Sequence, residues 1–415
     1  MERFQSLLAI PVLCLIAWVM SESKRKFPWR VVLWGTGLQF VFAVIILWSS
    51  GGRVAFEWLG DFVTRFLGFA AHGAEFLFGN MVKPEFQSTF GFQFAFAILP
   101  TIIFFGAVMA VGYHLGVMQR VVKWIAWVMS KTMKTSGAES LSCAANIFLG
   151  QTEAPLIIRP FLPTLTRSEL NAVMVGGFAT IAGGVMAGYI VLGIPAKHLL
   201  AASVMSAPAA LVFAKITVPE REQPMTAGKV HLPEMPRNAN IIDAAAVGAM
   251  DGLKLAVNVG AMLLAFIALI AVVNALLAWT SYHLLNLGFL YFPSSLKEIF
   301  SLLFWPLAFL LGVPVKECTD FGYLLGTQMS VNEFVAFVDL ANMIKAGTLS
   351  PRAVALASYA LCGFANFSSI AIQIGGISGL APERRQDLAQ LGLRAMIAGN
   401  LASYQTAAIA GMLIK

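Results

Sequence analysis

The chain has 415 residues, of which 58% are hydrophobic and only 12% are charged, and its mean hydropathy is +0.78. Because soluble domains carry about 25% charged residues, this composition excludes a soluble protein and indicates one that crosses a membrane several times. The net charge of +7 at pH 7 is accounted for by basic loops and headgroup contacts. Basic and aromatic residues do not alternate as in proteins that bind single-stranded nucleic acid, so we expect no nucleic-acid partner.

Runs of about 20 apolar residues mark membrane-spanning helices, and we predict about eight of them. They cover residues 5–21, 31–49, 91–117, 168–193, 198–216, 256–279, 353–379 and 390–413. The first run lacks an Ala-x-Ala cleavage site and is followed at once by Lys24, Arg25 and Lys26, so we predict a retained helix and not a cleaved signal peptide. If this basic cluster is cytoplasmic, as the positive-inside rule requires, eight crossings put both termini outside.

Three further segments, 53–82, 118–133 and 294–310, mix aromatic, aliphatic and charged residues at mostly three-to-four spacing. This spacing predicts amphipathic helices that lie in the membrane interface. The polar, Pro-rich stretch 219–240 predicts a cytoplasmic loop between two halves of the molecule. Residues 241–255 are expected to form a short surface helix before the sixth span.

The two halves of the chain repeat one arrangement. In the first half, Gly-Gln-Thr-Glu at 150–153 precedes a span that contains Gly-Phe-Ala-Thr at 177–180. In the second half, Gly-Thr-Gln at 326–328 and Asn-Glu-Phe at 332–334 precede a span that contains Gly-Phe-Ala-Asn at 363–366. Paired interruptions at corresponding positions of two halves point to a transporter site at mid-membrane.

We therefore predict re-entrant hairpins over 136–165 and 312–344, and broken helices over 168–193 and 353–379. The hairpin tips should meet in the interior, because irregular backbone at that depth must be buried in protein or line a wet cavity. The predicted fold is an all-α polytopic membrane protein with about eight transmembrane helices, two re-entrant hairpins, interfacial helices and inverted internal repeats.

The tips and breaks carry polar side chains but no converging cation. They are Gln151, Thr152, Glu153, Glu333, Asn366 and Ser369. An anionic substrate would find no partner here, so we predict a neutral or cationic substrate rich in hydroxyl and amide groups. Carboxylates suit the vicinal hydroxyls of a sugar, amides suit both edges of a base, and Phe364 offers an apolar face to a planar ring.

Other interpretations of these residues stay open. Asn and Ser in membrane helices often only bond across to a neighbouring helix, a contact worth about 0.6 kcal/mol. Glu153 and Glu333 are also compatible with structural charges held by backbone N–H groups at a hairpin tip, and the glycines of 176–184 with close helix packing. An uncoupled channel or a substrate sensor is an alternative function. An enzyme is disfavoured, because all five histidines lie outside the tip motifs, at His72, His114, His198, His231 and His283.

Four ordered motifs resemble the concentrative nucleoside transporter family in its short bacterial form. They are Gly-Gln-Thr-Glu-Ala-Pro at 150–155, Gly-Gly-Phe-Ala-Thr-Ile-Ala-Gly at 176–183, Asn-Glu-Phe-Val-Ala at 332–336 and Ala-Leu-Cys-Gly-Phe-Ala-Asn-Phe-Ser-Ser at 360–369. The resemblance implies a homotrimer in the lipid bilayer of the bacterial inner membrane, where the charge distribution would place both termini in the periplasm. It implies inward nucleoside transport by alternating access, driven by sodium or, alternatively, by protons.

The resemblance also implies a division of the chain into a scaffold and a moving transport domain. Residues 1–117 would form mainly scaffold helices and an interfacial helix, 118–216 the first half of the transport domain, 217–285 the cytoplasmic loop and a scaffold helix, and 286–415 the second half of the transport domain.

Individual roles follow from the same resemblance. The positions that contact the base would be Gln151, Thr152 and Glu153, with Val185 nearby, and those that contact the ribose would be Glu333, Asn366 and Ser369, while Phe364 would lie beside the nucleoside. The resemblance places sodium at Asn146, Val175, Gly176, Thr180 and Ile181, the apolar residues acting through backbone carbonyls. Such oxygen ligands suit a hard cation.

Overall fold

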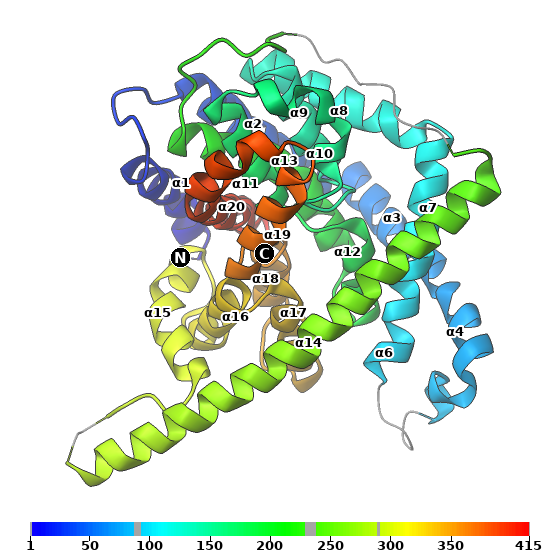
Figure 1. Ribbon diagram of the computed structural model, residues 1–415. Coiled ribbons are helices and arrows are strands. Elements are labelled where there is room, and N and C mark those ends of the chain that lie inside the picture. Colours follow the sequence, from blue (N-terminus) through cyan, green and yellow to red (C-terminus); the bar gives the residue numbers. More distant parts are fainter. Residues whose placement is uncertain (1, 87–92, 229–237, 289–290, 415) are drawn as a thin grey trace.

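The computed structural model describes residues 2–86, 93–228, 238–288 and 291–414, and in this part of the chain the secondary structure consists of helices without any strand (Figure 1). The predicted all-α fold is confirmed. Helices satisfy all their backbone hydrogen bonds internally, which a lipid environment requires.

Six helical segments of the described residues are long and apolar enough to cross a membrane. They are α1 (Glu2–Val19), α2 (Trp29–Ala43) with its π-helical continuation (Val44–Trp48), α6 (Phe94–Ala97) with α7 (Leu99–His114), α11 (Arg167–Phe178) with α12 (Gly183–Val191), α13 (Ala196–Thr217) and α14 (Ile241–Asn286).

The predicted seventh and eighth spans are the helix pair α18 (Pro351–Ala360) and α19 (Phe367–Ser378), and the helix α20 (Arg385–Leu413). These helices are not among the six that are long and apolar enough to cross a membrane. α18 and α19 are each too short, and α20 is made less apolar by polar residues such as Arg394, Asn400 and Gln405. The exact number of crossings therefore stays a prediction.

Both predicted hairpin segments have two helical arms on either side of a non-helical tip. The first has α9 (Gly137–Ala145) and then α10 (Ala154–Ile157) with a 3-10 helix (Arg159–Thr164), around a tip at 146–153. The second has α16 (Cys318–Ser330) and α17 (Glu333–Ala346). Asn332 starts α17 by accepting a hydrogen bond from the Val335 N–H at 2.9 Å, as an N-cap does. That these hairpins enter and leave the membrane on one side, and that the halves are inverted, stay predictions.

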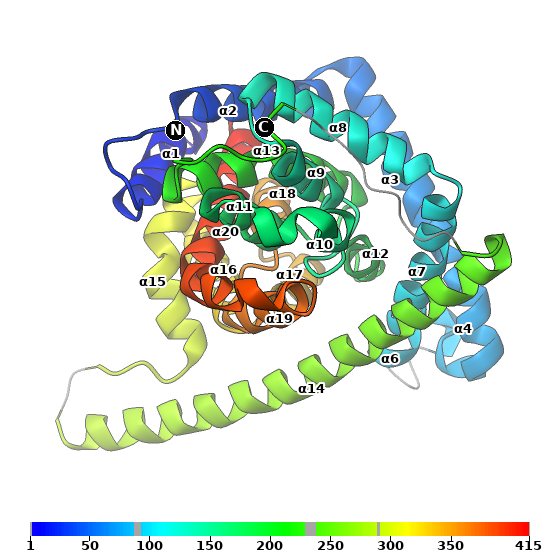
Figure 2. The same ribbon diagram turned by 45° about the horizontal axis from the view of Figure 1, so that its top comes forward.

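The long helix α14 contradicts one prediction. Residues 241–255 do not form a separate surface helix but continue into the sixth span, giving one helix of 46 residues that is about 70 Å long. No proline and no two adjacent glycines interrupt the Ala- and Val-rich run, so packing against α7 decides that it forms one helix. Gly248 and Gly252 instead allow α7 to approach closely, since a Cβ on Gly252 would lie 2.8 Å from the Ile103 Cα. In both views α14 runs along the outside of the other helices (Figures 1 and 2).

The three segments predicted to be interfacial are helical. They form α3 (Ser50–Gly68) and α4 (Ala70–Phe78), α8 (Val117–Met133), and α15 (Leu296–Leu310). Short 3-10 helices occur at Gly79–Met81, Pro84–Phe86, Val315–Glu317 and Pro382–Arg384. Of the predicted loop 219–240, residues 229–237 lie outside the described part of the chain.

The core of the molecule is built around α13 and α20. Most residues of both helices are buried, and a chain of polar side chains joins them to α2. Gln405 Nε2 donates to Gln39 Oε1 at 2.7 Å, and Gln39 Nε2 donates to the Thr406 hydroxyl at 3.0 Å and to the Met205 backbone carbonyl at 3.1 Å. Because these buried amides are hydrogen-bonded, burying them costs little free energy. Their hydrogen bonds hold the surrounding helices in one register.

Candidate functional site

The two broken helices meet at their interruptions. The Phe364 N–H, in the break between α18 and α19, donates to the Thr180 carbonyl in the break between α11 and α12 at 3.2 Å. Gly363 makes this approach possible, because a Cβ there would lie only 2.7 Å from the Phe178 carbonyl oxygen. Backbone groups that one break leaves without a helical hydrogen bond are thus partly hydrogen-bonded by the other break. The two interruptions that the sequence pairs lie at one place in the fold.

The second hairpin adds a buried carboxylate to this place. Glu333 Oε2 accepts a hydrogen bond from Asn366 Nδ2 at 3.0 Å, and Oε1 accepts one from the Tyr189 hydroxyl at 3.3 Å. Asn366 Oδ1 in turn accepts from the Ser369 N–H at 2.9 Å and from the Ser368 hydroxyl at 2.7 Å. Asn366 therefore caps α19 with its oxygen and orients Glu333 with its nitrogen.

The first hairpin tip joins the same set of contacts through Gln151. Its Nε2 donates to the Ser369 hydroxyl at 3.2 Å, and its Oε1 accepts from Gln373 Nε2 at 3.1 Å. Gln373 also donates to the Met174 carbonyl of α11 at 3.1 Å. A continuous series of hydrogen bonds thus runs from Tyr189 through Glu333, Asn366, Ser369 and Gln151 to Gln373.

Thr152 and Glu153 lie beside this series and not within it. The Thr152 side chain is half-buried against Gly376 of α19. Glu153 is exposed, and its carboxylate turns back to accept from the Gly150 N–H of its own tip. In this conformation Glu153 is a charge held by a backbone amide, which is one of the interpretations that the sequence leaves open.

Aromatic side chains surround Glu333. Tyr189 stacks on Phe337 with ring centroids 4.1 Å apart and meets Phe334 edge-on at 5.1 Å. Of the predicted apolar contacts, Val185 in the first turn of α12 is 2% exposed and Phe364 is 9% exposed. In such apolar surroundings a carboxylate depends on its two donors, because few other groups can satisfy it.

Two of these residues were missed in the sequence. Gln373 lies one helical turn after Ser369, so the spacing of four residues would have placed both on one face of α19. Tyr189 carries no such signal, because its helix meets Glu333 only through the packing of the two halves.

Three of the residues predicted to hold sodium, Asn146, Gly176 and Thr180, lie close to one another. Asn146 is fully buried, its Nδ2 donates to the Ser142 carbonyl at 3.0 Å, and its Oδ1 has no hydrogen-bond partner among the described residues. A Cβ on Gly176 would lie 3.3 Å from Asn146 Nδ2, so the two residues are neighbours. The Thr180 hydroxyl donates to the Gly176 carbonyl at 2.9 Å.

This arrangement fits a hard monovalent cation. Besides Asn146 Oδ1, the Ser142 hydroxyl also lacks a hydrogen-bond partner in the described part of the chain. The sequence motifs did not single out Ser142. Val175 and Ile181 are fully buried, and the Val175 carbonyl accepts from the Ala179 N–H at 2.8 Å. A carbonyl oxygen has a second lone pair, so that bond does not prevent it from binding an ion.

Family comparisons agree with these motifs. Residues 8–81 match a family model described as the N-terminus of Na+ dependent nucleoside transporters, residues 95–196 match one described as nucleoside recognition, and residues 198–411 match the C-terminus of Na+ dependent nucleoside transporters.

Similar proteins occur in bacteria and in animals. An uncharacterized transporter of Haemophilus influenzae is 43% identical, with 100% of this chain and 98% of that protein covered. The uncharacterized transporter YutK of Bacillus subtilis is 46% identical over the full length of both proteins. The sodium/nucleoside cotransporter 1 of Mus musculus is 42% identical over 99% of this chain, which spans 64% of the mouse protein.

The fold is also that of solved transporter structures. The structure of CNTnw in an inward-facing, substrate-bound state is 41% identical, covers 100% of this chain and 98% of that chain, and superposes with a TM-score of 0.92. Variants of CNTnw in outward-facing and intermediate states match with TM-scores between 0.91 and 0.93.

Proposed function

Because the chain belongs to the concentrative nucleoside transporter family, whose members are transporters and not enzymes, we propose that it is a sodium-coupled symporter that imports nucleosides by alternating access. We further propose that it works in the bacterial inner membrane as a homotrimer, with both termini periplasmic. The substrate class is a proposal for this chain, since relatives such as the mouse cotransporter carry it in their names.

The observation that supports this function best is the series of hydrogen bonds that joins both hairpins at the crossing of the broken helices. Each amide, hydroxyl or carboxylate in it can exchange its intramolecular partner for a substrate hydroxyl or base edge, at a small net cost in free energy. Glu333, Asn366 and Ser369 would contact the ribose. Gln151 and Thr152 would contact the base.

The remaining substrate residues complete this proposal. Val185 and Phe364 would pack against the nucleoside. Glu153 would contact the base after its carboxylate leaves the Gly150 N–H, so we propose that it turns inward when substrate binds. Its exposed position gives it room for this movement.

Sodium would bind at Asn146, Thr180 and the carbonyls of Val175, Gly176 and Ile181. Asn146 is the C-cap of α9 and the first residue of the tip that carries Gln151. A cation held there would order the tip, so that a nucleoside binding second loses less conformational entropy. Coupling of this kind is reciprocal, so the nucleoside would also raise the affinity for sodium.

Transport would then require the hairpin-bearing part of the chain to move against a scaffold. We propose that the first, second, third and sixth predicted spans form this scaffold, and that both hairpins move together with the broken helices. The contact between Thr180 and Phe364 supports a common movement, because it ties the two interruptions to each other.

Proton coupling is the second candidate, because the buried carboxylate of Glu333 could carry the proton. Uptake of labelled uridine into proteoliposomes distinguishes the two candidates. We expect accumulation with an inward sodium gradient and little with a proton gradient alone. Full accumulation without sodium would overturn sodium coupling, whereas absence of accumulation for a panel of purine and pyrimidine nucleosides under both gradients would overturn the substrate class.

A further inference from the structure

Helix α8 lies between two residues with left-handed backbone conformations. Gly116, with φ +75°, turns the chain after α7, and Lys134, with φ +57°, ends α8. The chain therefore changes direction sharply at both ends, and α8 runs across the end of α7 in both views (Figures 1 and 2).

The two sides of α8 have opposite character. Val122, Ala126, Met129 and Met133 are buried, and their spacing of three and four residues places them on one face. The opposite face carries Arg120, Lys123, Trp124, Trp127 and Lys131. Both indoles of this face are largely exposed, at 62% and 51%.

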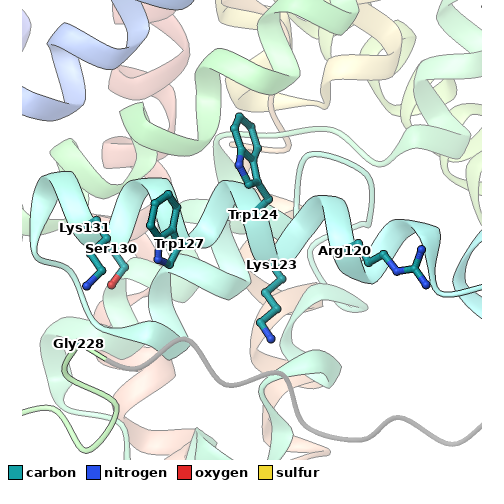
Figure 3. A pocket seen from close by; sticks show the side chains of 7 residues that line it. All are labelled: Arg120, Lys123, Trp124, Trp127, Ser130, Lys131 and Gly228. Atoms are coloured by element: carbon teal, nitrogen blue, oxygen red, sulfur yellow. The ribbon is translucent and has the colours of Figure 1, made fainter.

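This exposed face borders a groove of about 430 Å³. The groove is lined by Arg120, Lys123, Trp124, Trp127, Ser130, Lys131 and Gly228 (Figure 3). From Arg120 to Lys131 it follows about 16 Å of helix, which is enough for a phospholipid headgroup and its glycerol.

The groove carries positive charge that no carboxylate of the described residues neutralises. Its lining contains three cationic side chains and no carboxylate, and in the described part of the chain none of these cations takes part in an ion pair. Elsewhere on the surface basic residues do have acidic partners, such as Lys197 with Glu57 at 3.3 Å. The groove is therefore complementary to an anion.

Its position favours a membrane lipid over a soluble anion. Arg30, at the start of α2, donates to the Thr132 carbonyl near the end of α8 at 3.2 Å, so the groove lies at the same end of the molecule as the basic residues 24–26. The positive-inside rule places such an end in the cytoplasm, where the leaflet surface is negatively charged. Exposed tryptophans are typical of side chains at the level of the headgroups.

We propose that this groove binds the headgroup of an anionic phospholipid of the cytoplasmic leaflet. Lys123, in the middle of the groove, contacts the phosphate, and Arg120 and Lys131 add positive charge at its two ends (Figure 3). Trp124 and Trp127 cover the glycerol and the first carbons of the acyl chains. A free phosphate would use the cations but would leave the indoles without a role. Bound lipid would hold α8, which directly precedes the first hairpin, at a fixed depth.

The test measures phosphatidylglycerol and phosphatidylcholine binding to the purified full-length protein by native mass spectrometry. We expect the protein to prefer phosphatidylglycerol over phosphatidylcholine. This preference should fall about tenfold or more in Lys123→Gln/Lys131→Gln, since each cation near an anionic surface contributes to the free energy of binding. Lys24→Gln/Arg25→Gln is the matched control, because it removes two exposed charges at the same end of the molecule and should keep the preference. An unchanged preference in the groove variant, or an equal loss in the control, overturns the proposal.

Two further measurements distinguish the lipid from a small anion and from misfolding. Trp124→Leu/Trp127→Leu keeps all charges and should still weaken phosphatidylglycerol binding, so the result does not depend on one variant. Glycerol 1-phosphate should compete poorly with the lipid. Equal competition by glycerol 1-phosphate would show a simple anion site and overturn the lipid assignment.

Discussion

The backbone N–H of Phe364 donates to the carbonyl oxygen of Thr180 at 3.2 Å. This hydrogen bond joins the interruptions of two broken helices, although the two residues are 184 positions apart in the sequence. Each interruption carries a different part of the proposed chemistry. Thr180 belongs to the proposed sodium residues, whereas Phe364 belongs to the proposed nucleoside residues. If either ligand rearranges its interruption, we expect this hydrogen bond to transmit the change to the other interruption.

We predict that Glu333→Gln weakens uridine binding by about tenfold to a hundredfold, because a hydrogen bond to a charged group contributes about 1.5–3 kcal/mol. The amide keeps the shape of the side chain but cannot accept at both oxygens from Asn366 and the substrate. Isothermal titration of the purified protein in sodium measures the effect.

Asp339→Asn is the matched control for that measurement. Asp339 lies on the same helix as Glu333 and accepts from the Tyr323 hydroxyl at 2.7 Å, outside the proposed site. Uridine affinity should stay at its wild-type value in this control. Wild-type affinity in Glu333→Gln would remove Glu333 from the nucleoside site.

A second prediction concerns sodium. Asn146→Ala should raise the sodium concentration that gives half-maximal uridine uptake at least about tenfold, the scale of one lost contact to a charged group. The buried Asn146 Oδ1 has no protein partner among the described residues, so removing it costs the fold little at that atom. Sodium titrations at saturating uridine measure the change.

Asn171→Ala is the control for sodium. Asn171 is a buried amide of α11 that donates to the Ala214 carbonyl at 3.0 Å, and its loss should lower thermal stability without altering the dependence on sodium. If Asn146→Ala also keeps the wild-type dependence, the proposed ion lies elsewhere.

The hairpin tips and helix breaks could be predicted from sequence, because glycine, proline and polar residues interrupt apolar runs there. The tip at 146–153 and the breaks before Gly183 and Phe367 lie where those interruptions occur. The continuity of α14 could not be predicted in the same way. Ala- and Val-rich residues with scattered charges are compatible with a surface helix and with a span, and the choice depends on packing against α7.

The site itself was only partly predictable. Motifs give the residue types at Gln151, Glu333 and Asn366, but not which of them bond to one another. The turn of Glu153 back onto Gly150 is decided by the local tip geometry. Tyr189 reaches Glu333 from another helix, and such a contact exists only in the assembled fold.

The third prediction concerns pH and Glu22, in the loop between α1 and α2. Partial burial alone would raise the pKa of this carboxyl, but hydrogen bonds and charges from Arg167, whose Nη2 lies 3.0 Å from Glu22 Oε1, and from Arg394 outweigh burial and lower the pKa below its ordinary value. The stabilisation is therefore fully present above the unfolded pKa of about 4.3 and is lost as the pH falls through the folded pKa.

Glu22→Gln should accordingly lower the free energy of unfolding by about 1 kcal/mol at pH 7, and the difference from wild type should vanish on acidification. Thermal unfolding at a fixed scan rate between pH 7 and pH 3 measures it. Glu57→Gln is the control, because Glu57 and Lys197 form a pair with side chains that are about half exposed, at 47% and 44%, and exposed pairs contribute little. A difference that does not shrink between pH 7 and pH 3 would contradict the assignment to the Glu22 charge.

The fourth prediction uses two adjacent glycines of α19 to test how closely the first hairpin tip must approach this helix. A Cβ on Gly376 would lie 2.8 Å from the Thr152 Cγ2, whereas a Cβ on Gly375 would meet nothing within 4 Å. Both substitutions to alanine raise helix propensity by about 1 kcal/mol, so they differ only in the contact with Thr152.

We expect Gly376→Ala to displace the tip and to lower uridine uptake about tenfold or more, since a displacement of about 1 Å at a binding constellation can cost a hundredfold. Gly375→Ala should transport at the wild-type rate and unfold at an equal or higher temperature. The double variant Gly376→Ala/Thr152→Ser removes the Cγ2 methyl group that the new Cβ would overlap, while it keeps the hydroxyl. It should therefore recover part of the uptake. Wild-type uptake in Gly376→Ala, or an equal loss in Gly375→Ala, would show that the approach of the tip to α19 is not required for transport.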